Sequence, residues 1–370
     1  MAGLGQTGGN SRTSFSDKSD VGRSYDLPTM DSAAHEARRR PAAAAANRKD
    51  PRMSPRRFLI ATLVTAAIPA SALAESAHGE ANFTGPLVTP AVNTLPAGMV
   101  NVEPYLVHTN SRGWFDSTGQ RHAEKPTARQ WQIALPMIYG LTENISVQLT
   151  LNAARTSVDG RHSDGLRMGD SALRVQSRLK APEADGTGLV LAVSAAQRLP
   201  TGKYHRLENN PLNGTGSGAT RTTLALGAQQ LQWLENGHAL RWRGQLAWSP
   251  SPGRVRLRGA SVYGTPAGFR GHATPGQAWN ASVAAEYVLD RRWVLVGEAI
   301  WNRESGTRVN GKANGLAAYT FPSGHAFSLA PAVEYHFNPK VGLIAGVQFT
   351  VDGRNATDDV APQVALNMVF

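Results

Sequence analysis

From about residue 100 to the last residue, the chain repeats one pattern in which every second residue of a run is large and apolar. One such run contains Trp131, Ile133, Leu135, Met137 and Tyr139, which alternate with polar or small residues. A period of two places successive side chains on opposite faces of a β-strand. No part of this region shows a helical period of useful length. The alternation therefore predicts an all-β protein whose strands each have one apolar face.

The connections between these runs alternate in length, and about twelve runs follow one another. Short turns such as 140–144 and 338–340 follow the even-numbered runs. The connections after the odd-numbered runs are long and rich in Gly, Ser, Asn, Arg and Asp; they cover 110–127, 155–168, 200–220, 250–276, 303–325 and 352–360. Such alternation places tight turns at one end of the sheet and loops at the other, as in outer-membrane barrels.

The apolar runs and their aromatic ends favour a membrane barrel over a soluble β-sandwich or propeller, in which strands also alternate. Each apolar face spans about ten residues, enough for a tilted strand to cross a bilayer. Aromatic residues lie mainly near strand ends, where a membrane barrel has its interfacial girdles; they are Tyr139, Trp233, Trp248, Tyr287, Trp293, Trp301, Phe337 and Phe370. Hydrocarbon offers an edge strand no hydrogen-bond partner, so the sheet must close. We predict a closed, antiparallel, up-and-down transmembrane β-barrel over residues 99–370.

The region before the barrel divides into three parts. Residues 53–74 have the plan of a secretory signal peptide, with Arg56 and Arg57, an apolar run and a small-x-small end. Cleavage is predicted near Ala74. Residues 1–52 have a composition typical of disorder, and we interpret them as an upstream extension that is absent from the mature protein.

Residues 75–98 form a Pro-rich N-terminal segment. The stretch 82–98 reads "NFTGPLVTPAVNTLPAG" and holds three prolines, so it is unsuited to the interior of a sheet. Two placements fit an apolar segment that precedes the first strand. It enters the lumen as a plug, or it caps the periplasmic mouth.

Charge and composition exclude several functions. The formal net charge is +11, but residues 1–57 hold 11 Lys/Arg against 6 Asp/Glu, which leaves a mildly basic barrel region without a Lys/Arg cluster. Nucleic acid is therefore not expected as a partner. The chain has no cysteine, and its histidines lack metal-ligand spacing. We expect no metal and no cofactor.

The side chains that alternate with the apolar series should face the lumen. The charged candidates are Arg174, Arg178, Arg198, Arg241, Arg243, Glu286, Glu298, Glu334 and His336. Positive residues lie in the middle strands and negative residues in later strands, so a closed barrel could set them facing one another. This arrangement fits a selectivity constriction for a polar or anionic solute. It fits equally a salt-bridged lumen that only holds the barrel closed.

Two short fragments of the sequence resemble motifs of a known outer-membrane family. They are Gly169-Asp170 in "GDSALRVQSRL" and Pro200-Thr201-Gly202 in "LPTGKY". With them, residues 82–370 resemble the outer-membrane family named for the meta-cleavage pathway of phenol degradation. The resemblance implies an outer-membrane β-barrel that transports small molecules, with hydrophobic or aromatic compounds as the solutes. It supplies no substrate residues.

Two other functions remain open beside the channel or transporter. One is a non-conducting structural or adhesive barrel. The other is a lipid hydrolase at the outer rim, with a serine and a histidine as its machinery. The candidates, His162-Ser163 and Ser323-Gly324-His325, do not match the motif of the barrel phospholipases, and a loop serine beside a histidine is common turn chemistry. We therefore expect a protein that is not an enzyme.

The chain ends on "QVALNMVF", in which Leu366, Met368 and Phe370 alternate with other residues. This end resembles the C-terminal signal that the barrel-insertion machinery reads in outer-membrane proteins. It predicts that machinery and the lipid of the outer membrane as partners. The expected location is the outer membrane of a Gram-negative bacterium, after the signal peptide is removed.

Overall fold

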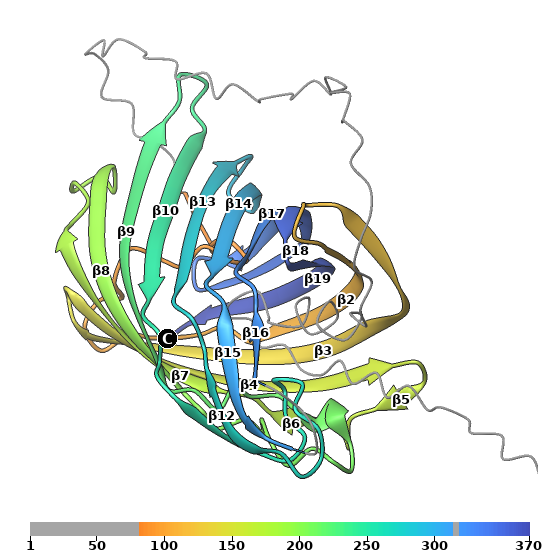
Figure 1. Cartoon of the computed structure of the whole chain (residues 1–370). Helices are drawn as coiled ribbons and strands as arrows, with labels where there is room; N and C mark the ends of the chain where they lie inside the picture. The colour runs from red at the N-terminus through yellow and green to blue at the C-terminus, as the bar shows by residue number, and fades with distance from the viewer. Residues whose placement is uncertain (1–80, 314–317) are drawn as a thin grey trace, which may run out of the picture.

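A computed structural model of the chain describes residues 81–313 and 318–370. Its strands form one large sheet that closes on itself and one small sheet beyond an end of it (Figure 1). The predicted extension 1–52, the signal peptide 53–74 and the cleavage site near Ala74 lie outside the described residues. Within the described ranges, no helix is long and apolar enough to cross a membrane.

The closed sheet confirms the predicted antiparallel barrel, and its wall consists of twelve long strands, here called staves. They are β2 (Tyr105–Phe115), β3 (Arg121–Thr142), β4 (Ile145–Val158), β7 (Ser171–Lys180), β8 (Gly188–Leu199), β9 (Arg221–Trp233), β10 (Ala239–Ser249), β13 (Ala278–Val288), β14 (Trp293–Glu304), β17 (Gly324–Asn338), β18 (Val341–Arg354) and β19 (Ala356–Val369). Each pairs antiparallel with the next along the chain, which is the up-and-down order expected from the short turns.

The barrel closes where the last strand meets the first. Strand β19 pairs with β2 in a register that sets Val364 opposite Leu106. The short strand β1 (Val100–Val102) continues the same seam, with Asn101 opposite Val369. Closure leaves no edge strand, so every stave has a hydrogen-bonding neighbour on both sides.

The alternation in the sequence sorts side chains between the two faces of the wall. On β7, Leu173, Val175 and Leu179 are 49%, 50% and 62% exposed on the outside. Gln176, between them in the sequence, is buried inside. A wall that is apolar outside and polar inside is the arrangement that a transmembrane barrel requires.

Two connections that were predicted as loops are strand instead. Strand β2 extends to Phe115, and β3 already begins at Arg121. Strands β18 and β19 are separated only by Asn355, whose φ is 47°. The ladders of hydrogen bonds continue after the apolar alternation has stopped, so the expected loops 110–127 and 352–360 are wrong. Residues beyond the bilayer do not need an apolar face, and their pairing is therefore invisible to periodicity.

A side-chain cage holds the β2–β3 turn. The Oδ1 of Asp116 accepts hydrogen bonds from Thr118 N and Gln120 N at 2.8 and 2.9 Å, and its Oδ2 lies 2.8 Å from His122 Nε2. The hydrogen bond from His122, together with those from Thr118 and Gln120, holds the pKa of Asp116 below its usual range.

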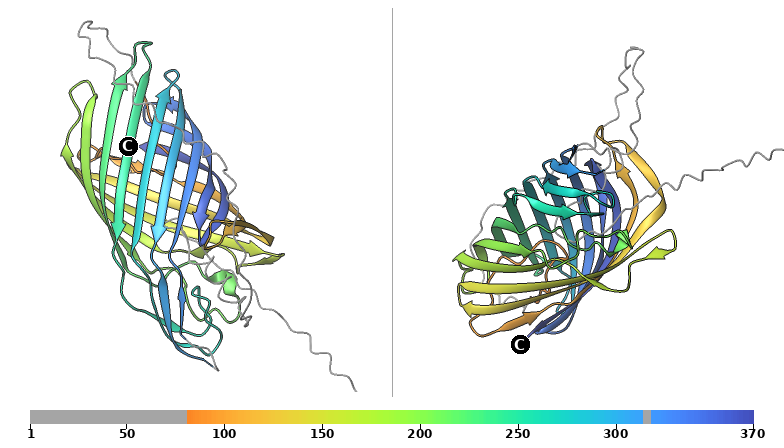
Figure 2. Two further views of the ribbon diagram at one scale, coloured as in Figure 1. Left: turned by 45° about the horizontal axis from the view of Figure 1, so that its top comes forward. Right: turned by 60° about the horizontal axis from the view of Figure 1, so that its bottom comes forward.

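The long connections build a small folded cap beyond the barrel (Figure 2). Its sheet has four strands, β11 (Val255–Arg258), β12 (Arg270–Thr274), β15 (Thr307–Lys312) and β16 (Tyr319–Phe321); the remaining short elements are β5 (Arg161–His162), β6 (Arg167–Met168) and the 3₁₀ turn η1 (Pro211–Asn213). Leu257, Tyr263 and Phe269 are buried in its core. Burial raises the pKa of the Tyr263 hydroxyl, which donates to Ser217 O at 2.7 Å.

The two family fragments meet at the base of this cap. The carboxylate of Asp170 accepts hydrogen bonds from Gly202 N at 3.1 Å and from Ser217 N at 2.9 Å. The hydroxyl of Thr201 donates to Gly169 O at 2.7 Å. The fragments thus tie the start of β7 to the end of β8 and to the loop 214–218, so their role is structural.

We predict that Gly216→Ala destabilises this junction. An added Cβ would lie 2.5 Å from Gly202 O and 2.6 Å from Asp170 Oδ1, so backbone must move. Overpacking of this kind costs about 1–3 kcal/mol, and the temperature at which the folded band disappears on a gel should fall. Gly297→Ala, whose Cβ meets nothing within 4 Å, is the matched control. Equal temperatures for the two variants would contradict the role of the junction.

Candidate functional site

The N-terminal segment, residues 81–98, lies against the inner face of the barrel and is held there by buried carboxylates. Glu334 on β17 accepts hydrogen bonds from Thr84 N at 2.6 Å and Gly85 N at 3.1 Å. Glu298 on β14 accepts from Val88 N at 3.1 Å and Thr89 N at 2.7 Å. This segment forms no strand with the wall, so side chains supply the acceptors that a neighbouring strand would supply.

The second half of the segment is bound by the opposite wall. Gln176 on β7 donates to Val92 O at 2.9 Å, and Ser146 on β4 accepts from Leu95 N at 2.9 Å. In the order of the twelve staves, β4 and β7 stand six places from β14 and β17. The segment therefore crosses the lumen from one side to the other.

Glycines in the wall make room for its apolar side chains. A Cβ on Gly346 of β18 would lie 2.7 Å from Leu87 Cδ1, and one on Gly227 of β9 would lie 3.1 Å from Val92 Cγ2. Leu87 and Val92 are both buried. The wall is thus shaped to receive this particular segment.

A buried ion cluster lies beside the segment. Arg241 and Glu286 are directly opposite each other on β10 and β13, and Arg241 Nε donates to Glu286 Oε2 at 2.7 Å. Arg243 Nε donates to the same oxygen at 3.1 Å. The guanidinium of Arg241 lies 3.8 Å from the ring centroid of Phe83, a cation–π contact with the segment.

The remaining predicted lumen residues fall into different surroundings. His336 is buried and its Nε2 lies 3.2 Å from Glu334 Oε2. Arg198 Nε is 3.8 Å from Asp170. Arg178 is at the short-turn end, where it donates to Asn93 Oδ1 and Asn144 Oδ1. Arg174 donates to Gln176 Oε1 at 2.5 Å.

The glutamates therefore do not face the arginines across an open lumen. Glu286 pairs with arginines of the adjacent strand, whereas Glu298 and Glu334 bind backbone of the N-terminal segment. The sequence pattern did not reveal these partners, because nothing in the alternation shows where a non-strand segment runs.

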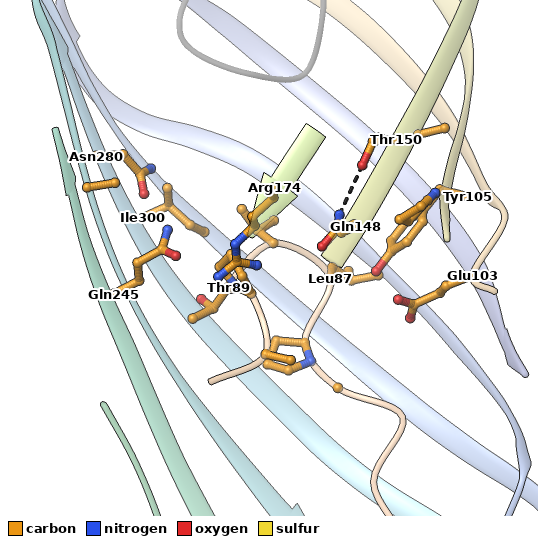
Figure 3. Close-up of a pocket in the computed structure, with 18 of the residues that line it drawn as sticks. Leu87, Thr89, Glu103, Tyr105, Gln148, Thr150, Arg174, Gln245, Asn280 and Ile300 are labelled. Atoms are coloured by element: carbon orange, nitrogen blue, oxygen red, sulfur yellow. Dashed lines mark hydrogen bonds between the residues drawn. The ribbon is translucent and has the colours of Figure 1, made fainter. Parts of the chain in front are cut away.

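A cavity of about 710 Å³ lies inside the barrel, lined by the segment and by most of the staves (Figure 3). Of the predicted lumen residues, Arg174, Arg198, Arg241 and Arg243 line it, while Arg178, Glu286, Glu298, Glu334 and His336 do not. Lining residues that the sequence analysis did not single out include Leu87, Thr89, Glu103, Tyr105, Arg221, Asn280 and Ile300. Arg221 precedes the first apolar residue of its strand, so period-two reading did not reach it.

The serine candidates of the outer loops form hydrogen bonds within their own turns or with other loops and, among the described residues, not with the histidine candidates. Ser163 is buried, and its hydroxyl donates to Gly165 O at 2.8 Å while accepting from Thr156 N at 3.2 Å. Ser323 contributes its backbone oxygen to Asn355 Nδ2. Over the described ranges, no hydrogen bond joins Ser163 or Ser323 to a histidine, and no group of three His, Asp or Glu residues could hold a metal ion.

A closed wall that is apolar outside, with a cavity of mixed polar and apolar lining inside, defines a transmembrane β-barrel. The sequence model of one family, described as "Putative MetA-pathway of phenol degradation", matches residues 127–359. The chain belongs to this family, which confirms the resemblance seen in its sequence.

One solved structure shares the fold, and two others are similar at lower TM-scores. The COG4313 outer membrane channel from Pseudomonas putida F1 is 17% identical with a TM-score of 0.57, over 75% of this chain and 98% of that one. The NanC porin is 7% identical with a TM-score of 0.40, over 72% and 98%. The translocator domain of the autotransporter NalP from Neisseria meningitidis is 13% identical with a TM-score of 0.40, over 75% and 90%. No curated protein matched the sequence.

We predict that the two carboxylates control the position of the N-terminal segment. In a chain with Glu298→Ala and Glu334→Ala, the four backbone N–H groups of Thr84, Gly85, Val88 and Thr89 lose their acceptors, and a hydrogen bond to a charged group is worth about 1.5–3 kcal/mol. Since the chain has no cysteine, Thr89→Cys gives a unique label site. Its reaction with a water-soluble maleimide should speed up by at least about tenfold.

The control is the same label site with Gln245→Ala, which removes a cavity side chain from another strand. All variants must first show the folded band on a gel. Equal labelling rates in the double variant and the control would mean that the carboxylates do not hold the segment.

Proposed function

We propose that the protein is an outer-membrane channel for small molecules and that the segment 81–98 is its plug. The observation that carries this proposal is the cavity of about 710 Å³ that lies beside the segment within a closed wall. A barrel needed only as a scaffold could fill its interior with side chains from the staves. Here a separate length of chain occupies the lumen.

The contacts of the segment support a plug that can move. It is held by hydrogen bonds and by the packing of apolar side chains such as Phe83, Leu87 and Val92, and it forms no strand with the wall. Each such bond contributes about 0.5–3 kcal/mol net. Displacing the segment would leave the backbone pairing of the twelve staves intact, which is the property a gate requires.

Family membership supports hydrophobic or aromatic compounds as the solutes, since the family description refers to phenol degradation. The cavity offers mixed surroundings for such molecules. Leu87, Ile300 and Phe349 contribute apolar surface, and Gln148, Gln245 and Asn280 contribute hydrogen-bonding groups. Most binding sites for small molecules combine these two kinds of lining.

A non-conducting structural barrel is the second candidate, and the crossing segment is the observation that favours it. The rim hydrolase has less support, because Ser163 is committed to its own turn. We therefore propose a protein without enzymatic activity.

Conductance across a planar bilayer tests the channel against the structural barrel. A chain lacking residues 82–93 should conduct several-fold more current per molecule than the full chain, because the bonds that cross the lumen are gone while the wall remains. Heat-modifiable migration on a gel checks that the wall has formed. If neither protein conducts, the channel proposal is wrong.

Assembly in the outer membrane is proposed to depend on the last residue. Phe370 pairs through its backbone with Val100, with N–H donors at 2.8 and 3.1 Å in the two directions, and its side chain is 66% exposed. It stands with Leu366 and Met368 on the closing strand. An exposed aromatic side chain at a strand edge suits recognition by strand pairing before closure.

Deleting Phe370 should therefore reduce the folded protein in outer-membrane fractions several-fold, while total synthesis stays unchanged. The control is Phe337→Ala, which removes an exposed aromatic side chain at a turn. A substitution is used at this position because deleting Phe337 would shift the register of its strand. Normal amounts of heat-modifiable barrel after the deletion would contradict the role of the terminus.

A further inference from the structure

Five arginines line the cavity, and four of them have a carboxylate partner. Arg198 lies 3.8 Å from Asp170, and Arg221 lies 3.1 Å from Glu304. Arg241 and Arg243 share Glu286. Buried or partly buried charges are normally paired in this way, because an isolated charge is costly to remove from water.

Arg174 is the exception among the described residues that line the cavity. Its guanidinium donates to the neutral side chain of Gln176, and no carboxylate of residues 81–313 or 318–370 lies within ion-pair distance. Strand pairing sets Gln148 opposite it on β4 and Ala196 opposite it on β8. Gln148 is neutral, and alanine is too short to cover the guanidinium.

Figure 3 shows Arg174 between two sides of the cavity. In that view Gln148 and Thr150 stand on one side, and Gln245, Asn280 and Ile300 stand on the other. The acidic residues in the lining, Glu103 and Asp359, belong to the seam of β1, β2 and β19, several staves away from β7.

Thr89 lines the same space. Its buried hydroxyl lies beside the carboxylate of Glu298, which accepts from the backbone N–H of Thr89 at 2.7 Å. A guanidinium only donates and a hydroxyl can also donate, so a ligand with acceptor oxygens can satisfy both. Apolar surface from Leu87, Ile300 and Phe349 completes the lining.

We propose that Arg174 and Thr89 form a binding site for the carboxylate of a small aromatic acid. The planar guanidinium matches a carboxylate with two parallel hydrogen bonds, and the aliphatic and aromatic lining receives the ring. This site rests on the proposed channel function and narrows its solutes from aromatic compounds in general to aromatic anions.

Isothermal titration of the purified, folded full chain in detergent tests the site without requiring transport. The probes are benzoate, the neutral benzamide and inorganic phosphate. Benzoate should bind the unmodified chain, and Arg174→Gln should weaken it at least about tenfold, the ordinary worth of a charge-assisted pair. Arg174→Lys should recover part of the affinity, and Thr89→Val should weaken binding by a smaller factor.

The matched control is Arg155→Gln, which removes the same charge from an exposed position on β4 opposite the outward-facing Trp131. It should leave benzoate binding unchanged. The proposal is overturned if benzoate does not bind the unmodified chain, if Arg174→Gln binds it equally well, or if benzamide or phosphate binds as tightly as benzoate.

Conductance separates this site from the channel itself. A barrel that conducts but does not bind benzoate overturns the site and leaves the channel standing. A barrel that binds benzoate through Arg174 but never conducts supports the site and refutes the channel.

Discussion

The whole architecture depends on backbone hydrogen bonds that hydrocarbon cannot supply. A strand edge facing lipid would leave its N–H and C=O groups without partners, at several kcal/mol each. The pairing of β19 with β2, extended by β1, removes that edge. Everything else follows from this closure, because a sealed wall creates an interior that must be filled by side chains, by water or by another part of the chain.

The interior is filled by satisfying a second set of backbone groups. Residues 81–98 hold three prolines and form no strand, so their N–H groups need acceptors from side chains. Glu298 and Glu334 each accept two of them. These two buried carboxylates are tolerable here because each one accepts hydrogen bonds from backbone N–H groups of the segment. Removing the carboxylates would leave those N–H groups without acceptors.

The sequence alone was enough to predict the barrel, because every lipid-facing stave must show its apolar series. Of the nine charged residues that it predicted to face the lumen, four line the cavity. It did not reveal that Glu298 and Glu334 bind the N-terminal segment, since a carboxylate that accepts from backbone has no partner residue with a recognisable pattern. It also missed the extended β2–β3 and β18–β19 hairpins, because the outer halves of their strands do not alternate apolar and polar residues.

The crossing segment has a mechanical consequence. It is bonded at one end to Glu334 on β17 and at the other to Ser146 on β4, which stand on opposite sides of the cylinder. A hollow cylinder under uneven lateral pressure from the bilayer flattens into an ellipse, and a tie across its diameter resists that deformation along one axis. The cross-section of the barrel is therefore stiffer along the axis of the segment than across it.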